Sequence, residues 1–173
     1  PEQTGTPLTL LHDASGIIRW TCHAPKSACQ GSQRTGQGYV EEISIDLARA
    51  RLPFKALWWG RAHIGHESLT WIRWAEGLEQ TWLLRNGSLV AGSFDAKDDG
   101  AICATIGEET WTVTEKRTLR HRDVKKQLPS WLIALTGTLP LAREHKFLGE
   151  VTLQTTTQPT ATGLAIGEMV QWE

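Results

Sequence analysis

The chain has 173 residues, of which 40% are hydrophobic and 21% are charged, and its formal net charge is −1. This size and composition predict one globular domain over residues 1–173 and exclude a disordered chain. The balanced charge argues against a nucleic-acid partner, and no apolar run reaches the roughly 18 residues that a membrane-spanning helix needs.

Short segments in which apolar and polar residues alternate recur along the chain, separated by Gly, Asn, Asp and Pro. This pattern is typical of all-β proteins. In chain order, strands are expected at residues 8–11, 17–23, 39–47, 56–64, 68–74, 80–85, 88–95, 101–106, 110–119, 131–136, 146–154 and 163–172. Turns are expected at 13–16, 76–77, 86–87, 98–100 and 158–159.

Two short segments carry further local information. Asn86 and Gly87 stand between two expected strands, and this pair favours a type I′ hairpin turn, which needs positive φ at both positions. Between Arg122 and Leu135 the spacing of apolar residues allows one short helix, whose start Pro129 limits.

The number of strands bears on the architecture. Ten or more antiparallel strands in one domain must close into a barrel or split into a sandwich, because either arrangement removes exposed edges. The nine tryptophans favour a barrel with an aromatic interior that holds one small apolar molecule.

Alternation places two glutamates on the more apolar faces of their strands. Glu41 shares its face with Tyr39 and Ile43, and Glu168 shares its face with Ile166. A carboxyl group that faces an apolar interior either pairs with a cation or keeps its proton with a raised pKa. Three interpretations stay open: a buried ion pair, an open barrel end, or a chemical site.

The candidate cation is Arg61, which shares a strand face with Trp59 and His63. This strand and the next, which contains Trp71, carry tryptophans on both faces, so alternation does not identify the interior face. Strands of this kind are often covered on both sides. His63 and His66 are three residues apart and would lie on opposite faces of a strand, so no metal site is expected.

Other functional classes lack support in the sequence. Cys22, Cys29 and Cys103 have no C-x-x-C spacing, which indicates neither a disulfide framework nor a zinc site and predicts a reducing, cytoplasmic location. The basic run 116–126 is interpreted as a solvated strand end, because no aromatic residues alternate with its charges. Hydrolase, nucleotide-binding and zinc-protease motifs are absent, and no cofactor is expected.

The segments GIIRW (16–20), AP (24–25), GQGYVE (36–41) and WWGRA (58–62) follow one another in a known order and approximate spacing. In these segments, over residues 16–74, the chain resembles the carotenoid 1,2-hydratase (hydroxyneurosporene synthase) and AttH-like family. Residues 163–172 agree more loosely, and residues 76–160 match mainly in their β-rich character. Members of this family are built from two lipocalin-like halves, and the chain resembles the second half.

The resemblance implies an antiparallel lipocalin-like (calycin-type) β-barrel. It also implies a hydratase, lyase or cyclase-type isomerase that protonates a carbon–carbon double bond of a hydrophobic, isoprenoid or polyketide-like substrate. By position, the family's acid falls on Glu41, with Tyr39 and Trp20 as aromatic neighbours. Burial among aromatic rings favours a protonated carboxyl, and the ring faces would stabilise a carbocation. The expected ligand-binding residues are Trp59, Arg61, Trp71 and Glu168.

Two departures from the family pattern leave alternatives open. Ile18 stands where the family has His, and Glu41 where it has Asp, so hydration loses a candidate base or water-orienting group. One alternative is a non-catalytic carrier in which the same residues orient a small hydrophobic ligand. Another is a structural half-domain that packs against a second copy or an upstream half, and association with a membrane is an alternative to a freely cytoplasmic protein.

Overall fold

The computed structural model describes residues 8–21, 33–45, 52–97, 101–127, 142–157 and 160–172, and it describes side chains from residue 52 onward. The chain divides into two compact units, residues 1–47 and residues 48–173. The expectation of one domain over the whole chain stays a prediction.

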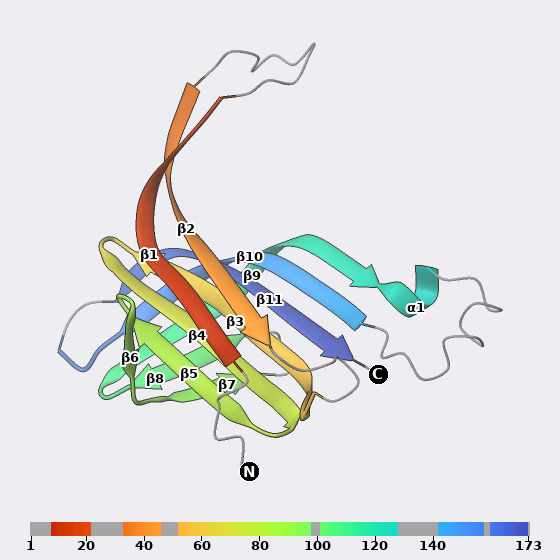
Figure 1. Ribbon diagram of the computed structural model, residues 1–173. Helices are drawn as coiled ribbons and strands as arrows, with labels where there is room; N and C mark the ends of the chain where they lie inside the picture. Colours follow the sequence, from red (N-terminus) through yellow and green to blue (C-terminus); the bar gives the residue numbers. More distant parts are fainter. Residues whose placement is uncertain are drawn as a thin grey trace. The chain divides into compact units, whose positions relative to one another are not determined.

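The first unit contains an antiparallel ribbon of two long strands, β1 (Leu8–Thr21) and β2 (Gln33–Ile45), shown in red and orange in Figure 1. The expected turn at 13–16 is wrong, because β1 runs through it as one strand. The register shifts between Asp13 and Gly16, so the small and polar residues there form an irregularity within the strand.

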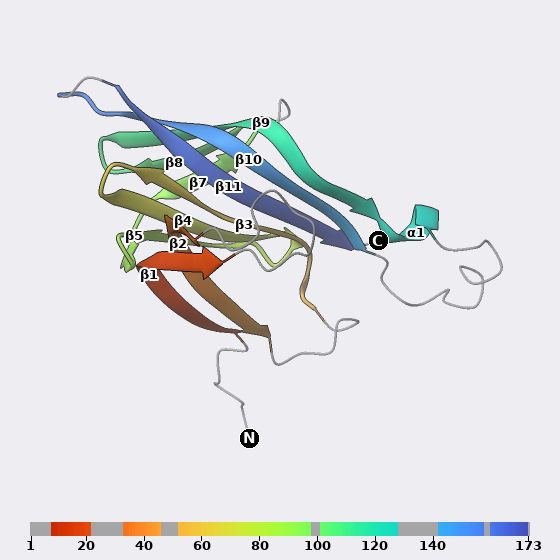
Figure 2. The ribbon, with the colours of Figure 1, turned by 90° about the horizontal axis from the view of Figure 1, so that it is seen from above.

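The second unit is one nine-stranded antiparallel sheet with the strand order β6-β5-β4-β3-β11-β10-β9-β8-β7. Figures 1 and 2 show this sheet curling, so that its two ends approach each other. Its strands are β3 (Phe54–Ile64), β4 (Glu67–Gly77), β5 (Gln80–Arg85), β6 (Ser88–Val90), β7 (Ser93–Ala96), β8 (Ile102–Ile106), β9 (Glu109–Asp123), β10 (Ala142–Gln154) and β11 (Ala161–Trp172).

Most expected strands of this sheet are confirmed, with bounds that differ by a few residues. The expected strand 88–95 is two short strands, β6 and β7, separated at Ala91 and Gly92. The helix allowed after Arg122 is present as the single turn α1 (Val124–Gln127). The expected strand 131–136 lies outside the described residues. The Asn86–Gly87 turn is confirmed, with φ of 49° and 81°.

The hydrophobic core lies on the concave face of the curled sheet. Its largest fully buried members include Trp71 and Leu83 on the neighbouring strands β4 and β5, and Trp111 on β9, which is far from them in the sheet order. Trp71 also contacts the ring of Phe94, at 6.4 Å between centroids, from the opposite end of the sheet. The sequence predicted that the barrel interior holds a ligand. Side chains fill the part of the interior around Trp71 and Phe94.

Two aromatic rings of the core lie directly on glycines. A Cβ atom at Gly60 would collide with the Trp71 ring and approach the carbonyl oxygen of Ile166 to 2.5 Å. The three atoms nearest to a Cβ atom at Gly167 would all belong to the ring of Phe147, which also lies near Gly149. The glycines thus provide the space that the rings occupy, and the interior is close-packed there.

Polar contacts join the two ends of the sheet. Arg85 on β5 donates through Nε to Glu67, at 3.2 Å, and through Nη1 to Glu109 on β9, at 2.5 Å. Arg73 on β4 donates to the carbonyl oxygen of Phe94 on β7, at 2.7 Å. Since β5 and β9 are not neighbours in the sheet, the Arg85 contacts fix the curl at this end of the barrel.

We expect Gly167→Ala to destabilise the fold by about 1–3 kcal/mol, because the added methyl group overpacks the core against Phe147. Phe147→Leu should also destabilise the fold, through lost burial. The double variant should be more stable than the sum of the two single losses predicts, by about 0.5 kcal/mol or more. Urea unfolding of all four proteins measures this coupling. Additive losses would show that the ring does not occupy the space over Gly167.

The contacts of Glu67 predict an acid-sensitive contribution to stability. A hydrogen bond from Asn86, followed by those from Arg85, lowers the pKa of Glu67 despite partial desolvation. A lowered folded-state pKa gives stability that is present above the unfolded-state value of about 4.3 and is lost as the pH falls through the folded-state value. Solvent screening limits it to about 1 kcal/mol.

Glu67→Gln should therefore be less stable than the wild type at pH 7, and this difference should shrink as the pH falls from about 5 to 3. Urea midpoints at each pH measure it. Glu79→Gln is the control, because Glu79 is 68% exposed and lies 3.6 Å from Arg73. A difference that stays constant with pH would contradict the role of the ionised Glu67.

Candidate functional site

The face of β3 and β4 opposite the core is also buried, and it carries charged and polar groups. Arg61, Ser68 and Thr70 are buried there beside Ile72 and Trp74. Residues of these two strands are therefore buried on both faces of the sheet. The face, called the Arg61 face below, comprises Leu57, Trp59, Arg61 and His63 on β3 with the residues paired to them on β4 and β11.

Arg61 is the most deeply buried charge of this face, with 1% of its surface exposed. Its Nη2 atom donates to the hydroxyl of Ser68, at 3.2 Å. Ser68 is held in turn by the hairpin turn, because its backbone N–H donates to Oδ1 of Asn86, at 2.8 Å. Burial, followed by the charge of Arg61, lowers the pKa of His63. The face therefore combines a buried guanidinium with an imidazole whose pKa is lowered.

Glu168 lies on the Arg61 face, and its cation is Lys146 on β10. The two side chains form an ion pair of 3.0 Å, and the ammonium group lies 5.7 Å from the ring centroid of Trp59. Because β11 pairs with β3 and β10, Glu168 stands directly opposite both Trp59 and Lys146. The contact brings two predicted ligand-binding residues together through a lysine that the sequence reasoning missed.

The expectation that Glu168 faces the barrel interior is wrong. On β11 the buried positions are Ala165 and Gly167, which adjoin the core, and the apolar row with Glu168 lies on the other face. Leu164 in that row is 74% exposed. The small residues face inward because aromatic rings from neighbouring strands occupy the space above them.

The remaining predicted site residues fall into two groups. Trp71 lies in the core, on the face opposite Arg61. The side chains of Trp20, Tyr39 and Glu41 lie outside the described residues, although the backbone register of the ribbon is defined. In that register Glu41 on β2 is paired directly with His12 on β1.

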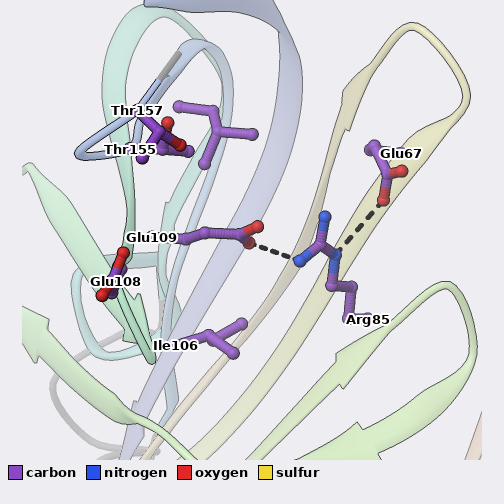
Figure 3. Close-up of a pocket in the computed structure, with 8 residues that line it drawn as sticks. Glu67, Arg85, Ile106, Glu108, Glu109, Thr155 and Thr157 are labelled. Atoms are coloured by element: carbon purple, nitrogen blue, oxygen red, sulfur yellow. Dashed lines mark hydrogen bonds and ion pairs between the residues drawn. The ribbon is translucent and has the colours of Figure 1, made fainter.

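A pocket of about 440 Å³ lies at the end of the barrel that Arg85 closes (Figure 3). Figure 3 shows Arg85 pointing between Glu67 and Glu109, with both ion pairs dashed. The carboxylates hold the guanidinium in place, and the hydrogen bond to Glu109 is the main reason that the pKa of Arg85 is raised. The pocket is also lined by Ile106, Glu108, Leu153, Thr155 and Thr157. With one arginine among three glutamates, it does not favour an anionic ligand.

The basic run agrees with its interpretation as a solvated strand end. Lys116 and Arg120 on β9 are more than half exposed and form ion pairs with Glu150 and Glu144. Over the segments described, no helix is long and apolar enough to cross a membrane.

Comparison with known proteins identifies a fold but no family. No family model matches the chain, and no curated protein matches it. Among solved structures, CghA with Sch210972 superposes with a TM-score of 0.55 at 11% identity, covering 95% of this chain and 55% of that one. CghA in a second structure gives 0.54 at 11% identity, with 95% and 54% covered.

Kievitone hydratase from Nectria haematococca gives a TM-score of 0.48 at 11% identity, with 82% of this chain and 45% of that one covered. The chain thus spans about half the length of these solved structures. The two CghA comparisons and the nine-stranded curled sheet together establish an antiparallel, all-β fold of the lipocalin-like barrel type.

Proposed function

We propose that the chain is part of an enzyme that acts on a small hydrophobic substrate by protonating a carbon–carbon double bond, with Glu41 as the acid. The observation that carries this proposal is the lipocalin-like fold found over 95% of the chain, in a protein whose segment 36–41 resembles the acid-bearing motif of carotenoid 1,2-hydratases. The structure of CghA with Sch210972 supports a small molecule as the ligand class for this fold.

In the proposed reaction the Glu41 carboxyl gives its proton to one carbon of the double bond, and the other carbon becomes cationic. Tyr39 and Trp20 stabilise this cation through their ring faces. Water then adds to the cation and loses a proton to the carboxylate, which restores the acid and gives an alcohol. In a cyclisation, a second double bond of the substrate attacks the cation in place of water, and the new cation then loses a C–H proton to the carboxylate, which forms a double bond in the product and restores the acid.

His12 is the proposed partner of Glu41. The family's histidine is replaced by Ile18, but the register of the ribbon pairs His12 with Glu41 across the two strands. Residues directly opposite in an antiparallel pair have Cβ atoms about 4.5–5.5 Å apart, close enough to interact. An imidazole at this position would orient the water that adds to the cation.

The Arg61 face is proposed to bind the ligand. Trp59 offers an aromatic surface, and Arg61 and the Lys146–Glu168 pair offer charged groups of fixed geometry. Such a mixture of apolar surface with few placed polar groups is typical of small-molecule sites. The role proposed for Trp71 stays a prediction, since that ring packs in the core.

Two alternatives from the sequence stay open, and one of them has specific support. A carrier would use the same residues without chemistry. A structural half-domain, which associates with a second copy or another half, is favoured by the coverage of only about 55% of CghA and by the 74% exposure of Leu164. Sedimentation distinguishes this alternative, because a half-domain with exposed apolar surface should associate as its concentration rises.

We expect an environment-sensitive apolar dye to bind the folded chain saturably and to quench tryptophan emission, because tryptophans lie on both faces of β3 and β4. Trp59→Leu should weaken binding by roughly five- to thirtyfold, which corresponds to about 1–2 kcal/mol for a lost aromatic contact. Trp111→Phe, a conservative change in the core, serves as the control. Unchanged affinity in Trp59→Leu would remove the Arg61 face from the binding site.

Protonation from solvent gives a direct test of Glu41. Compounds with terminal isoprenoid double bonds are incubated with the enzyme in D₂O, and deuterium bound to carbon is measured by mass spectrometry. Glu41→Gln should lower the rate about 10²–10⁴-fold, as expected for the loss of a positioned acid, while substrate affinity changes little.

Glu42→Gln is the matched control for this test, because it is the neighbouring glutamate on the same strand and is paired with Leu11 rather than His12. Equal losses in the two variants would contradict a specific acid at residue 41. Binding without any deuterium incorporation, in the wild type and in both variants, would identify a carrier.

A further inference from the structure

A cluster of two histidines and a glutamate lies on the barrel strands β9 and β10, apart from the residues discussed above. His121 and His145 are directly paired across these strands, and their rings meet edge to face with centroids 5.7 Å apart. Glu115 accepts a hydrogen bond from Nε2 of His145, at 2.7 Å. Its other oxygen accepts a hydrogen bond from the hydroxyl of Thr118, at 2.6 Å.

Two register shifts in β9 create this cluster. Along β10, His145, Phe147 and Gly149 alternate normally and share one face. Their partners on β9 are His121, Thr118 and Glu115, which are three residues apart because the register shifts after Lys146 and again after Leu148. Each shift adds one residue to β9, so side chains at a spacing of three lie on the same face.

The hydrogen bond to Glu115 defines the state of His145. A carboxylate only accepts hydrogen bonds, so Nε2 carries the proton and a neutral His145 has its lone pair at Nδ1. A carboxylate bound to the far nitrogen of a histidine is the usual outer partner of a metal-binding imidazole, where it fixes the tautomer and the ring orientation.

The distance between the two Nδ1 atoms distinguishes a hydrogen bond from a metal site. They are 3.4 Å apart, which is long for a hydrogen bond between nitrogen atoms. Two nitrogen ligands, each about 2.05 Å from a tetrahedral Zn²⁺, lie about 3.3–3.4 Å from each other. The spacing of the histidines therefore fits an ion between them better than a shared proton.

We propose that His121 and His145 bind a divalent ion of the Zn²⁺ type through their Nδ1 atoms, with Glu115 holding His145 in the binding tautomer. Within the segments described, no three His, Cys, Asp or Glu side chains converge as a complete ligand set. The site therefore has two protein ligands, and water occupies the remaining positions. His121 is exposed and the His145 side chain is 26% exposed, so the ion reaches the site from solvent.

The surroundings are compatible with a cation. On the same face, Arg143 is compensated by Asp123 at 3.5 Å, and Glu115 contributes a further negative charge. Imidazole ligands suit Zn²⁺, Cu²⁺, Ni²⁺ and Fe²⁺, and they are poor ligands for Mg²⁺ and Ca²⁺.

Isothermal titration of the untagged protein with Zn²⁺ tests the proposal, using His121→Gln, His145→Gln and Glu115→Gln. Each histidine variant should lose one Zn²⁺ or bind it at least about tenfold more weakly, and Glu115→Gln should weaken binding about 10–100-fold. His66→Gln is the matched control, because His66 is exposed in the turn after β3. Mg²⁺ should give no binding at this site.

A second measurement uses the unaltered protein, so it does not depend on the folding of a variant. Zn²⁺ should protect His121 and His145, but not His66, from carbethoxylation by diethyl pyrocarbonate, as mapped by mass spectrometry. Unchanged stoichiometry and affinity in His121→Gln, or labelling of His121 and His145 that Zn²⁺ does not slow, would overturn the proposal. So would Co²⁺ binding with a thiolate charge-transfer band, which would assign the ion to cysteines.

Discussion

The packing of aromatic rings onto glycines is the constraint on which the curled sheet depends. Trp71 occupies the space above Gly60, and Phe147 the space above Gly167. A side chain at either glycine would push a ring out of the core or separate two strands. Trp71 lies on β4, Gly60 on β3 and Gly167 on β11, so the three strands that carry the Arg61 face are fixed from their inner side by these contacts. Burial of the rings is worth several kcal/mol in total.

Local sequence signals predicted most of the second unit. Alternation located seven of its nine strands in nearly correct positions and merged β6 and β7 into one, and Asn86 with Gly87 predicted the turn that appears with positive φ at both residues. The faces of β11 were assigned wrongly for a physical reason. Alternation ranks faces by hydrophobicity, whereas the inner face here is defined by small residues that make room for rings from other strands.

The polar sites could not be predicted from single strands, because their residues meet only through the pairing of neighbouring strands. Lys146 could not be matched to Glu168 without the pairing of β10 with β11. The cluster of Glu115, His121 and His145 was missed because a spacing of three normally places strand residues on opposite faces, which is the argument that excluded His63 with His66. The two residues added to β9 at the register shifts place side chains at a spacing of three on the same face. The local composition does not indicate where these shifts occur.

The hairpin turn between β5 and β6 gives the two faces of the barrel a common anchor. Asn86 accepts a hydrogen bond from the backbone of Ser68, which binds Arg61, and donates one to Glu67, which binds Arg85. This series of contacts leads from the buried Arg61 on one face, around the end of β4, to the ion pair between Arg85 and Glu109 at the end of the barrel. A molecule that displaces the Arg61 side chain would break this series of hydrogen bonds at Ser68. The ion pairs of Arg85 would then change, although the molecule does not touch them.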